Sequence, residues 1–125
     1  MKIDDIRLLF DYHYWGNRRI LDAAAGLSQD QFLSPPGHGL ESLRAILSHC
    51  IDAEYGWRTL WETGTIDGFE TFSEASFPTL DELARRWAAE EQAMRAYLAG
   101  LTDADLSGLV RYAAWDGAKR ERILW

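Results

Sequence analysis

Residues 43–61 read LRAILSHCIDAEYGWRTLW and have the apolar spacing of an amphipathic helix. Apolar side chains recur there at steps of three and four residues, which places them on one side of a helix. We predict a helix from about Glu41 to Glu62. Its expected apolar band consists of Leu43, Ile46, Leu47, Cys50, Ala53, Trp57, Leu60 and Trp61.

Two further segments show the same period. The first runs from about Ile3 to Ala25 and is followed by Gly26, a residue type that often ends helices. Its expected core stripe is Ile3, Ile6, Phe10, His13, Asn17, Ile20, Leu21 and Ala24. The second segment begins at Thr79, which forms a capping-box pattern with Glu82. Its expected core residues are Leu80, Leu83, Trp87, Met94, Leu98 and Leu101.

The connections between these helices also carry recognisable patterns. Ser28 and Gln31 form another capping-box pattern, which predicts a short helical turn towards Phe32. Residues 63–77 lack helical periodicity, so we expect a long loop, and long loops in compact domains are often functional. Asp116-Gly117 predicts the turn of a hairpin within residues 109–123. The final Ile-Leu-Trp triplet, residues 123–125, resembles the opening of another helix.

These patterns predict an all-α fold, because helices with broad apolar faces need partners to cover them. We expect a four-helix bundle with a short β-hairpin before the last helix, which is missing or only begun in this chain. The 125 residues suit a single domain spanning 1–125, incomplete at its C-terminal end. Either this chain lacks its last helix or another subunit covers the apolar faces.

Composition restricts the class of protein. The formal net charge of −7 argues against nucleic acid or an anionic membrane surface as a partner. Cys50 is the single cysteine, so no intrachain disulfide can form, and a reducing cytoplasm is the expected compartment. No signal peptide pattern and no apolar run of about 18 residues occurs, so we expect no membrane association.

His49 is the candidate metal ligand, because imidazole is the commonest metal-binding side chain and this one lies at the edge of the predicted apolar band. Asp52, one turn further on, could orient the ring or share a metal. The alternative is a partly exposed histidine that hydrogen-bonds to a neighbouring helix. Cys50 points about 100° away from His49 on a helix, which excludes a nucleophile–base pair, and we expect it in the core.

His13 and Glu91 lie near the centres of the stripes of their helices, with Asn17 one turn beyond His13. Buried polar groups need partners, because an unsatisfied one costs about 1–3 kcal/mol. We therefore predict a structural network of His13, Asn17 and Glu91, although a contribution of His13 or Glu91 to a site stays open. His38 is expected to face water. No local spacing completes a zinc site.

Several segments together resemble the DinB/YfiT-like superfamily. They are LFDYHYWGNRRILDAAAGLS at 8–28, LRAILSHCIDAEYGW at 43–57, FPTLDELARRW at 77–87, the tail AYLAGLTDADL and the hairpin residues VRYAAWDG. The resemblance implies an up-down-down-up four-helix bundle and a homodimer. It also implies a divalent metal, zinc or nickel, held by three histidines, of which His49 matches the first.

Characterised relatives in this superfamily include transferases and isomerases that use bacterial low-molecular-weight thiols. The resemblance therefore implies a thiol-dependent transferase or a metal-dependent hydrolase with a small-molecule substrate. The other two histidines of the family pattern would follow Trp125, so we expect this chain alone to be inactive and to bind metal weakly or not at all. The alternative is a non-catalytic helical interaction module that dimerises through an exposed apolar face.

Overall fold

A computed structural model of the chain describes residues 1–37, 39, 41–65, 69–113 and 118–124. Its α-helices are α1 (Ile3–Ala24), α2 (Gln29–Leu33), α3 (Leu43–Thr63) and α4 (Leu80–Ala99). Short 3₁₀ turns cover Glu74–Ser76 and Asp105–Ser107, and a hairpin of β1 (Leu109–Ala113) and β2 (Lys119–Ile123) follows. The predicted helical bundle with a C-terminal hairpin is confirmed, and the helix ends agree with the predicted ones to within two residues.

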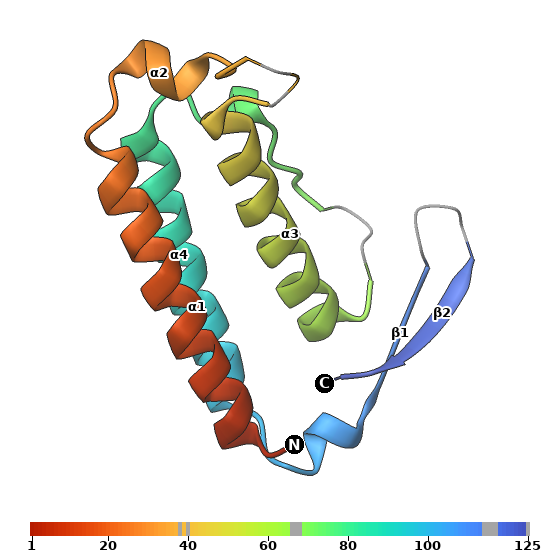
Figure 1. Cartoon of the computed structure of the whole chain (residues 1–125). Coiled ribbons are helices and arrows are strands. Elements are labelled where there is room, and N and C mark those ends of the chain that lie inside the picture. The colour runs from red at the N-terminus through yellow and green to blue at the C-terminus, as the bar shows by residue number, and fades with distance from the viewer. Residues whose placement is uncertain (38, 40, 66–68, 114–117, 125) are drawn as a thin grey trace.

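The three long helices pack side by side, with α1 and α3 both lying against α4. Figure 1 shows that α1 runs in one direction and that α3 and α4 both run in the opposite one. These are the first three directions of the up-down-down-up order. The parallel arrangement of α3 and α4 explains the long connection between them, because the chain must travel back along α3 before α4 can begin.

The helix starts follow the capping chemistry of the sequence. The Thr79 hydroxyl accepts from the backbone N–H of Glu82 at 3.3 Å, and the Glu82 carboxylate accepts from the backbone N–H of Thr79 at 3.1 Å. Ser28 and Gln31 form the same reciprocal pair at the start of α2. Both predicted capping boxes are confirmed, and each satisfies backbone donors that a helix leaves unpaired.

Gly26 and Gly100 do not adopt the left-handed conformation that is usual for a glycine at a helix end. Gly26 lies beyond α1, but its φ angle is not positive, and Gly100 caps α4 in right-handed helical geometry with a φ of −78°. Gly64 at the end of α3 is the helix cap that adopts the left-handed conformation, with a φ of 73°. The backbone N–H of Gly64 donates to the carbonyl of Leu60 at 2.8 Å, which satisfies one of the last orphan carbonyls of the helix.

The core has two adjoining parts. One part joins all three long helices and α2 through Phe32, Leu47, Ile51, Phe77, Leu83 and Trp87, with Leu21 packed against it. The other is built on Tyr14, Met94 and Leu98. Several predicted core residues lie outside both parts: Ile20, Ile46 and Trp57 are 44–49% exposed, and Cys50 is also exposed. Those predictions were wrong, because the apolar bands of α1 and α3 are wider than the faces that these helices bury.

A buried ion pair links α3 to α4 within the core. The Glu90 side chain is fully buried, and its carboxylate accepts two hydrogen bonds from the Arg58 guanidinium, one of them from Nη2 at 2.9 Å. Arg86 lies 3.5 Å from the same carboxylate, and Glu62 pairs with Arg58 at 2.6 Å. The bidentate geometry suits a guanidinium and supplies the partners that a buried charge requires.

The hairpin is antiparallel, with Tyr112 opposite Arg120 and Arg111 opposite Glu121. Its base is closed by the N–H of Leu124, which donates to the Gly108 carbonyl at 2.9 Å. Val110 and Tyr112 are partly buried, whereas their neighbours along β1 are exposed, so one face of the hairpin is turned towards the helices. The predicted hairpin is confirmed, and its Asp116-Gly117 turn lies outside the described residues.

In the described part of the chain, none of the helices has the length and apolar character needed to cross a membrane.

Candidate functional site

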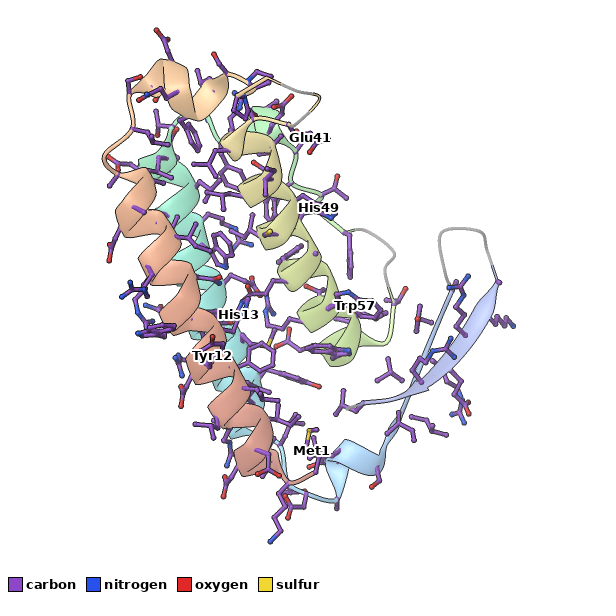
Figure 2. The ribbon with its side chains drawn as sticks, in the orientation of Figure 1. Met1, Tyr12, His13, Glu41, His49 and Trp57 are labelled. Carbon is purple, nitrogen blue, oxygen red and sulfur yellow. The ribbon has the colours of Figure 1, made fainter. Side chains whose placement is uncertain are left out.

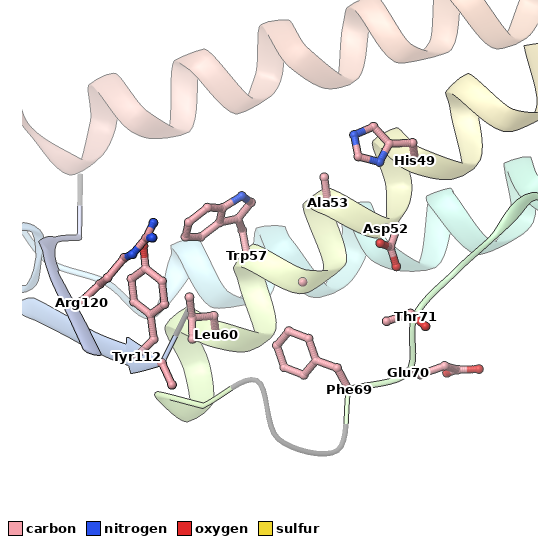
Figure 3. Close-up of a pocket in the computed structure, with 12 residues that line it drawn as sticks. His49, Asp52, Ala53, Trp57, Leu60, Phe69, Glu70, Thr71, Tyr112 and Arg120 are labelled. Atoms are coloured by element: carbon pink, nitrogen blue, oxygen red, sulfur yellow. The ribbon is translucent and has the colours of Figure 1, made fainter. Parts of the chain in front are cut away.

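A pocket of about 500 Å³ opens between α3, the loop after it and the hairpin (Figure 3). This volume lies within the range of about 300–1,000 Å³ that is usual for small-molecule sites. The pocket wall is mainly apolar, with a few charged side chains. Its lining residues are His49, Asp52, Ala53, Gly56, Trp57, Leu60, Phe69, Glu70, Thr71, Tyr112, Ala113 and Arg120.

His49 projects from α3 at one end of this pocket, and its side chain is exposed (Figures 2 and 3). Ala53 and Gly56 follow on the same side of the helix and present little bulk. A Cβ atom added at Gly56 would lie 3.7 Å from Cε2 of Phe69, so the loop closes over the helix at this point. His49 therefore has an open imidazole at the mouth of a pocket, which is the placement a ligand-binding histidine needs.

Asp52 joins α3 to the loop that forms the pocket wall. Its Oδ1 accepts a hydrogen bond from the backbone N–H of Phe72 at 2.6 Å. The Phe72 ring packs on Tyr55 at a centroid distance of 5.1 Å, and the Arg86 guanidinium lies 4.7 Å from the Phe72 ring centroid. These contacts hold the preceding residues Phe69, Glu70 and Thr71 against the pocket. One oxygen of Asp52 thus has a structural partner, while the residue also lines the pocket beside His49.

The hairpin supplies the far end of the pocket. The Tyr112 ring meets Trp57 edge-on at a centroid distance of 6.0 Å and an interplanar angle of 83°. Arg120 lies opposite Tyr112 in the ladder, and opposite residues project from the same face of a sheet. Figure 3 shows Arg120 and Tyr112 at one end, His49 and Asp52 at the other, and Trp57 between them.

A separate polar cluster centres on Glu54, which connects all three long helices. The Glu54 side chain is only 7% exposed. Its carboxylate accepts hydrogen bonds from His13 at 3.1 Å, from Trp87 Nε1 at 2.9 Å and from the Tyr14 hydroxyl. Asn17 lies 3.0 Å from the same His13 nitrogen. These five side chains form one network across the bundle.

This cluster corrects the predicted network of His13, Asn17 and Glu91. The contact between His13 and Asn17 is present, but the carboxylate that completes it is Glu54 on α3. Glu91 on α4 instead binds Arg18 at 3.1 Å and Arg95 at 2.9 Å. The physical reason is the helix arrangement, because the His13 side of α1 is turned to α3, whereas the side bearing Arg18 is turned to α4.

The electrostatics of the cluster favour an ionised Glu54. Burial alone would raise the pKa of Glu54, but the hydrogen bonds from His13, Tyr14 and Trp87 outweigh it and lower that pKa below its usual value. Burial, together with the hydrogen bond to Glu54, raises the pKa of Tyr14 far above its ordinary range, so this phenol stays protonated and donates. Burial and the nearby Glu54 charge also raise the pKa of the Cys50 thiol. Cys50 is therefore a poor nucleophile at neutral pH.

Sequence reasoning identified His49 and Asp52 but missed Glu54 and Arg120. A signal for Glu54 was present, because it lies seven residues after Leu47 and seven before Trp61, in the middle of the apolar band of α3. No comparable signal existed for Arg120, since its place in the pocket depends on the hairpin register and on how the hairpin meets α3. His38, expected to face water, lies outside the described residues.

The described residues do not form a complete metal site. Within residues 1–37, 39, 41–65, 69–113 and 118–124, no group of three or more His, Cys, Asp or Glu side chains is arranged to hold an ion. His49 supplies one imidazole, and structural zinc or catalytic metal sites use three or four protein ligands. The role of His49 as a metal ligand therefore stays a prediction.

Comparison with known proteins identifies the family to which the chain belongs. No curated protein and no solved structure matches the chain. The sequence model of the DinB superfamily matches residues 13–125, which include the three long helices from His13 onwards and the hairpin. The match covers most of the chain, and the chain belongs to the DinB superfamily.

Proposed function

We propose that this protein binds a divalent metal ion, zinc or nickel, with His49 as one ligand. We further propose that it acts on a small molecule in the adjoining pocket, as a thiol-dependent transferase or a metal-dependent hydrolase. The observation that carries the proposal is the exposed His49 ring at the mouth of a pocket of about 500 Å³. Membership of the DinB superfamily supports the metal-binding part.

The remaining metal ligands are proposed to come from outside the described residues, for example from a second subunit. One exposed imidazole holds a metal ion weakly, because affinity depends on several donors in a fixed geometry. We therefore expect weak binding by the 125-residue chain unless such donors are supplied. A low-molecular-weight thiol is the proposed co-substrate of the transferase reaction, since the described residues offer only the poorly reactive Cys50 as a thiol nucleophile.

The test compares metal binding by the wild-type protein with binding by His49→Ala and His13→Ala. His13 is the matched control, because it is also a partly exposed helical histidine but bonds to Glu54 instead of lining the pocket. Titration with Zn²⁺ and with Ni²⁺ should show at least about a tenfold loss of affinity in His49→Ala and little change in His13→Ala. Equal metal affinity in the wild-type protein and His49→Ala would contradict the assignment of His49.

A second candidate function rests on a different surface of the molecule. Leu8, Tyr12 and Trp15 project from α1 with exposures of 49–70%, and the rings of Tyr12 and Trp15 stack at a centroid distance of 5.5 Å. Contiguous exposed apolar side chains of this kind often mark protein–protein contacts. We propose this face as the homodimer contact of a non-catalytic interaction module, if the pocket proves inert.

Sedimentation of the double variant Tyr12→Ser/Trp15→Ser tests this second candidate. The wild-type protein should sediment as a dimer and the double variant as a monomer. Leu109→Ser is the control, because Leu109 is 50% exposed but lies on the hairpin. A monomeric wild-type protein would rule out the interaction module.

A further inference from the structure

We infer that the pocket beside His49 takes an elongated organic anion, a carboxylate with an aromatic or alkyl body, whose charged group lies at Arg120. This inference deepens the proposed function and rests on it in one respect, since it assigns the end of the ligand that lies near His49 as the reactive end. The residues that line the pocket by themselves indicate the carboxylate end and the apolar body of the ligand.

The hairpin register places Arg120 where it can serve this pocket. Arg120 faces Tyr112 across the ladder, and both residues line the pocket. Side chains alternate between the two faces of a strand, so Arg111 and Glu121 lie on the other face, where they pair at 2.5 Å. Arg120 therefore lines the pocket (Figure 3), whereas Arg111 lies on the opposite face of the hairpin.

A guanidinium at a pocket end is suited to a carboxylate. Its planar fork carries five N–H donors, and it binds a carboxylate through two parallel hydrogen bonds. Five donors leave capacity for a ligand even where an arginine also has a partner within the protein. Arg120 is held on a strand, which fixes the position of its backbone better than a loop would.

The middle of the pocket fits a flat apolar body. Trp57, Phe69 and Tyr112 contribute aromatic rings, and Ala53 and Gly56 leave space next to the helix. Trp57 is 48% exposed, so a ligand that covers it removes apolar surface from water. Aromatic rings also offer offset-stacked or edge contacts to an aromatic ligand.

The charged residues at the two ends of the pocket determine the orientation of the ligand. Asp52 and Glu70 line the pocket near His49, and Arg120 lines the opposite end. An anionic group is repelled by the two carboxylates and attracted by the guanidinium, so it lies at the hairpin. In the proposed function, the metal ion supplies the positive charge that complements Asp52 and Glu70.

The experiment measures binding of three probes that share one body and differ in charge: 5-phenylvalerate, 5-phenylpentan-1-ol and 5-phenylpentylamine. Titration calorimetry is done on the full chain in the presence of EDTA, so that no metal ion can attract the carboxylate. We expect the carboxylate to bind about tenfold more tightly than the alcohol, as a charge-assisted hydrogen bond would provide. The amine, which Asp52 and Glu70 attract to the opposite end of the pocket, should keep its affinity when Arg120 is replaced.

Variants then test which residue causes the preference for the carboxylate. Arg120→Gln should abolish the preference for the carboxylate while leaving the affinity for the alcohol nearly unchanged. Arg111→Gln is the matched control, because it removes an arginine from the other face of the same hairpin, and it should retain the preference. Trp57→Ala should lower the affinity for all three probes by a similar factor, about fivefold or more, because apolar contact is lost. Circular dichroism of each variant establishes that it is folded.

The inference is overturned if the wild-type protein does not bind the carboxylate more tightly than the alcohol, or if Arg120→Gln keeps that preference. These outcomes are independent of the metal proposal, because His49→Ala should lose metal affinity but keep the carboxylate preference in EDTA. A loss of the preference in both Arg120→Gln and Arg111→Gln would also overturn the assignment, since it would indicate a general charge effect of the hairpin.

Discussion

Arg58 of α3 and Glu90 of α4 are paired in the interior of the protein, with Nη2 of the arginine 2.9 Å from Oε2 of the fully buried glutamate. This contact joins α3, which lines the pocket, to α4, and both helices contribute to the Glu54 cluster. A buried charge that loses its partner is strongly unfavourable. The stability of the bundle therefore depends on the presence of both side chains.

Removing one member of this pair should destabilise the protein strongly. Glu90→Ala is expected to lower the free energy of unfolding by about 3–5 kcal/mol, because Arg58 and Arg86 both lose the buried carboxylate that they contact and, among the described residues, Arg58 keeps only Glu62 as an ion-pair partner. Urea denaturation measures the change. Glu62→Ala is the control, since Glu62 pairs with the same arginine near the surface, and it should cost under about 1 kcal/mol. Similar losses in the two variants would show that burial does not govern the contribution of the pair.

The Glu54 cluster should make stability depend on pH. The pKa of Glu54 is lower in the folded protein than in the unfolded chain, where it is about 4.3. The ionised Glu54 therefore contributes its full stabilisation above the unfolded pKa, and this contribution is lost as the pH falls through the folded pKa. The stability difference between the wild-type protein and Glu54→Gln should therefore be large near about pH 7 and shrink below about pH 4. Denaturation curves across this range provide the measurement. A difference that stays constant or grows in acid would refute an ionised, hydrogen-bonded Glu54.

Replacing Gly64 and Gly16 with alanine should change the stability of the protein in opposite directions. Gly64 has a φ of 73°, so Gly64→Ala should destabilise the protein by about 1 kcal/mol. Gly16 lies inside α1, where an added Cβ meets no atom within 4 Å. Gly16→Ala should therefore stabilise the protein by about 0.5–1 kcal/mol. Thermal unfolding of both variants measures the changes, and the same sign for both would contradict the backbone argument.

The cap of α4 should contribute measurably to stability. Thr79→Ala removes the hydroxyl that accepts from the Glu82 N–H and is expected to cost about 1 kcal/mol. Thr79→Ser keeps a hydroxyl at the same position and should cost much less. Denaturant midpoints of the two variants separate loss of the cap from loss of the methyl group. Equal destabilisation by the two changes would show that the methyl group, not the cap, matters.

The pattern of residues was sufficient to predict the long helices, two capping boxes and the hairpin. Each of these features depends on interactions between residues close together in the chain, such as the pairing of Thr79 with Glu82. The exposure of individual residues was harder to predict. Ile46, Cys50 and Trp57 belong to an apolar band, yet they remain exposed, because periodicity indicates a face and not the partner that covers it.

Among the polar contacts, too, those between residues close in the chain were predictable and those between distant residues were not. His13 and Asn17 are one turn apart on a single helix, so their contact was predictable from spacing. Whether Glu54 or Glu91 completes the network depends on which neighbouring helix the His13 side of α1 meets. The position of Arg120 in the pocket likewise results from a hairpin register and its contact with α3. Local sequence sets elements of structure through short-range forces, whereas these contacts arise from long-range packing, in which many pairings compete and their total free energy selects one.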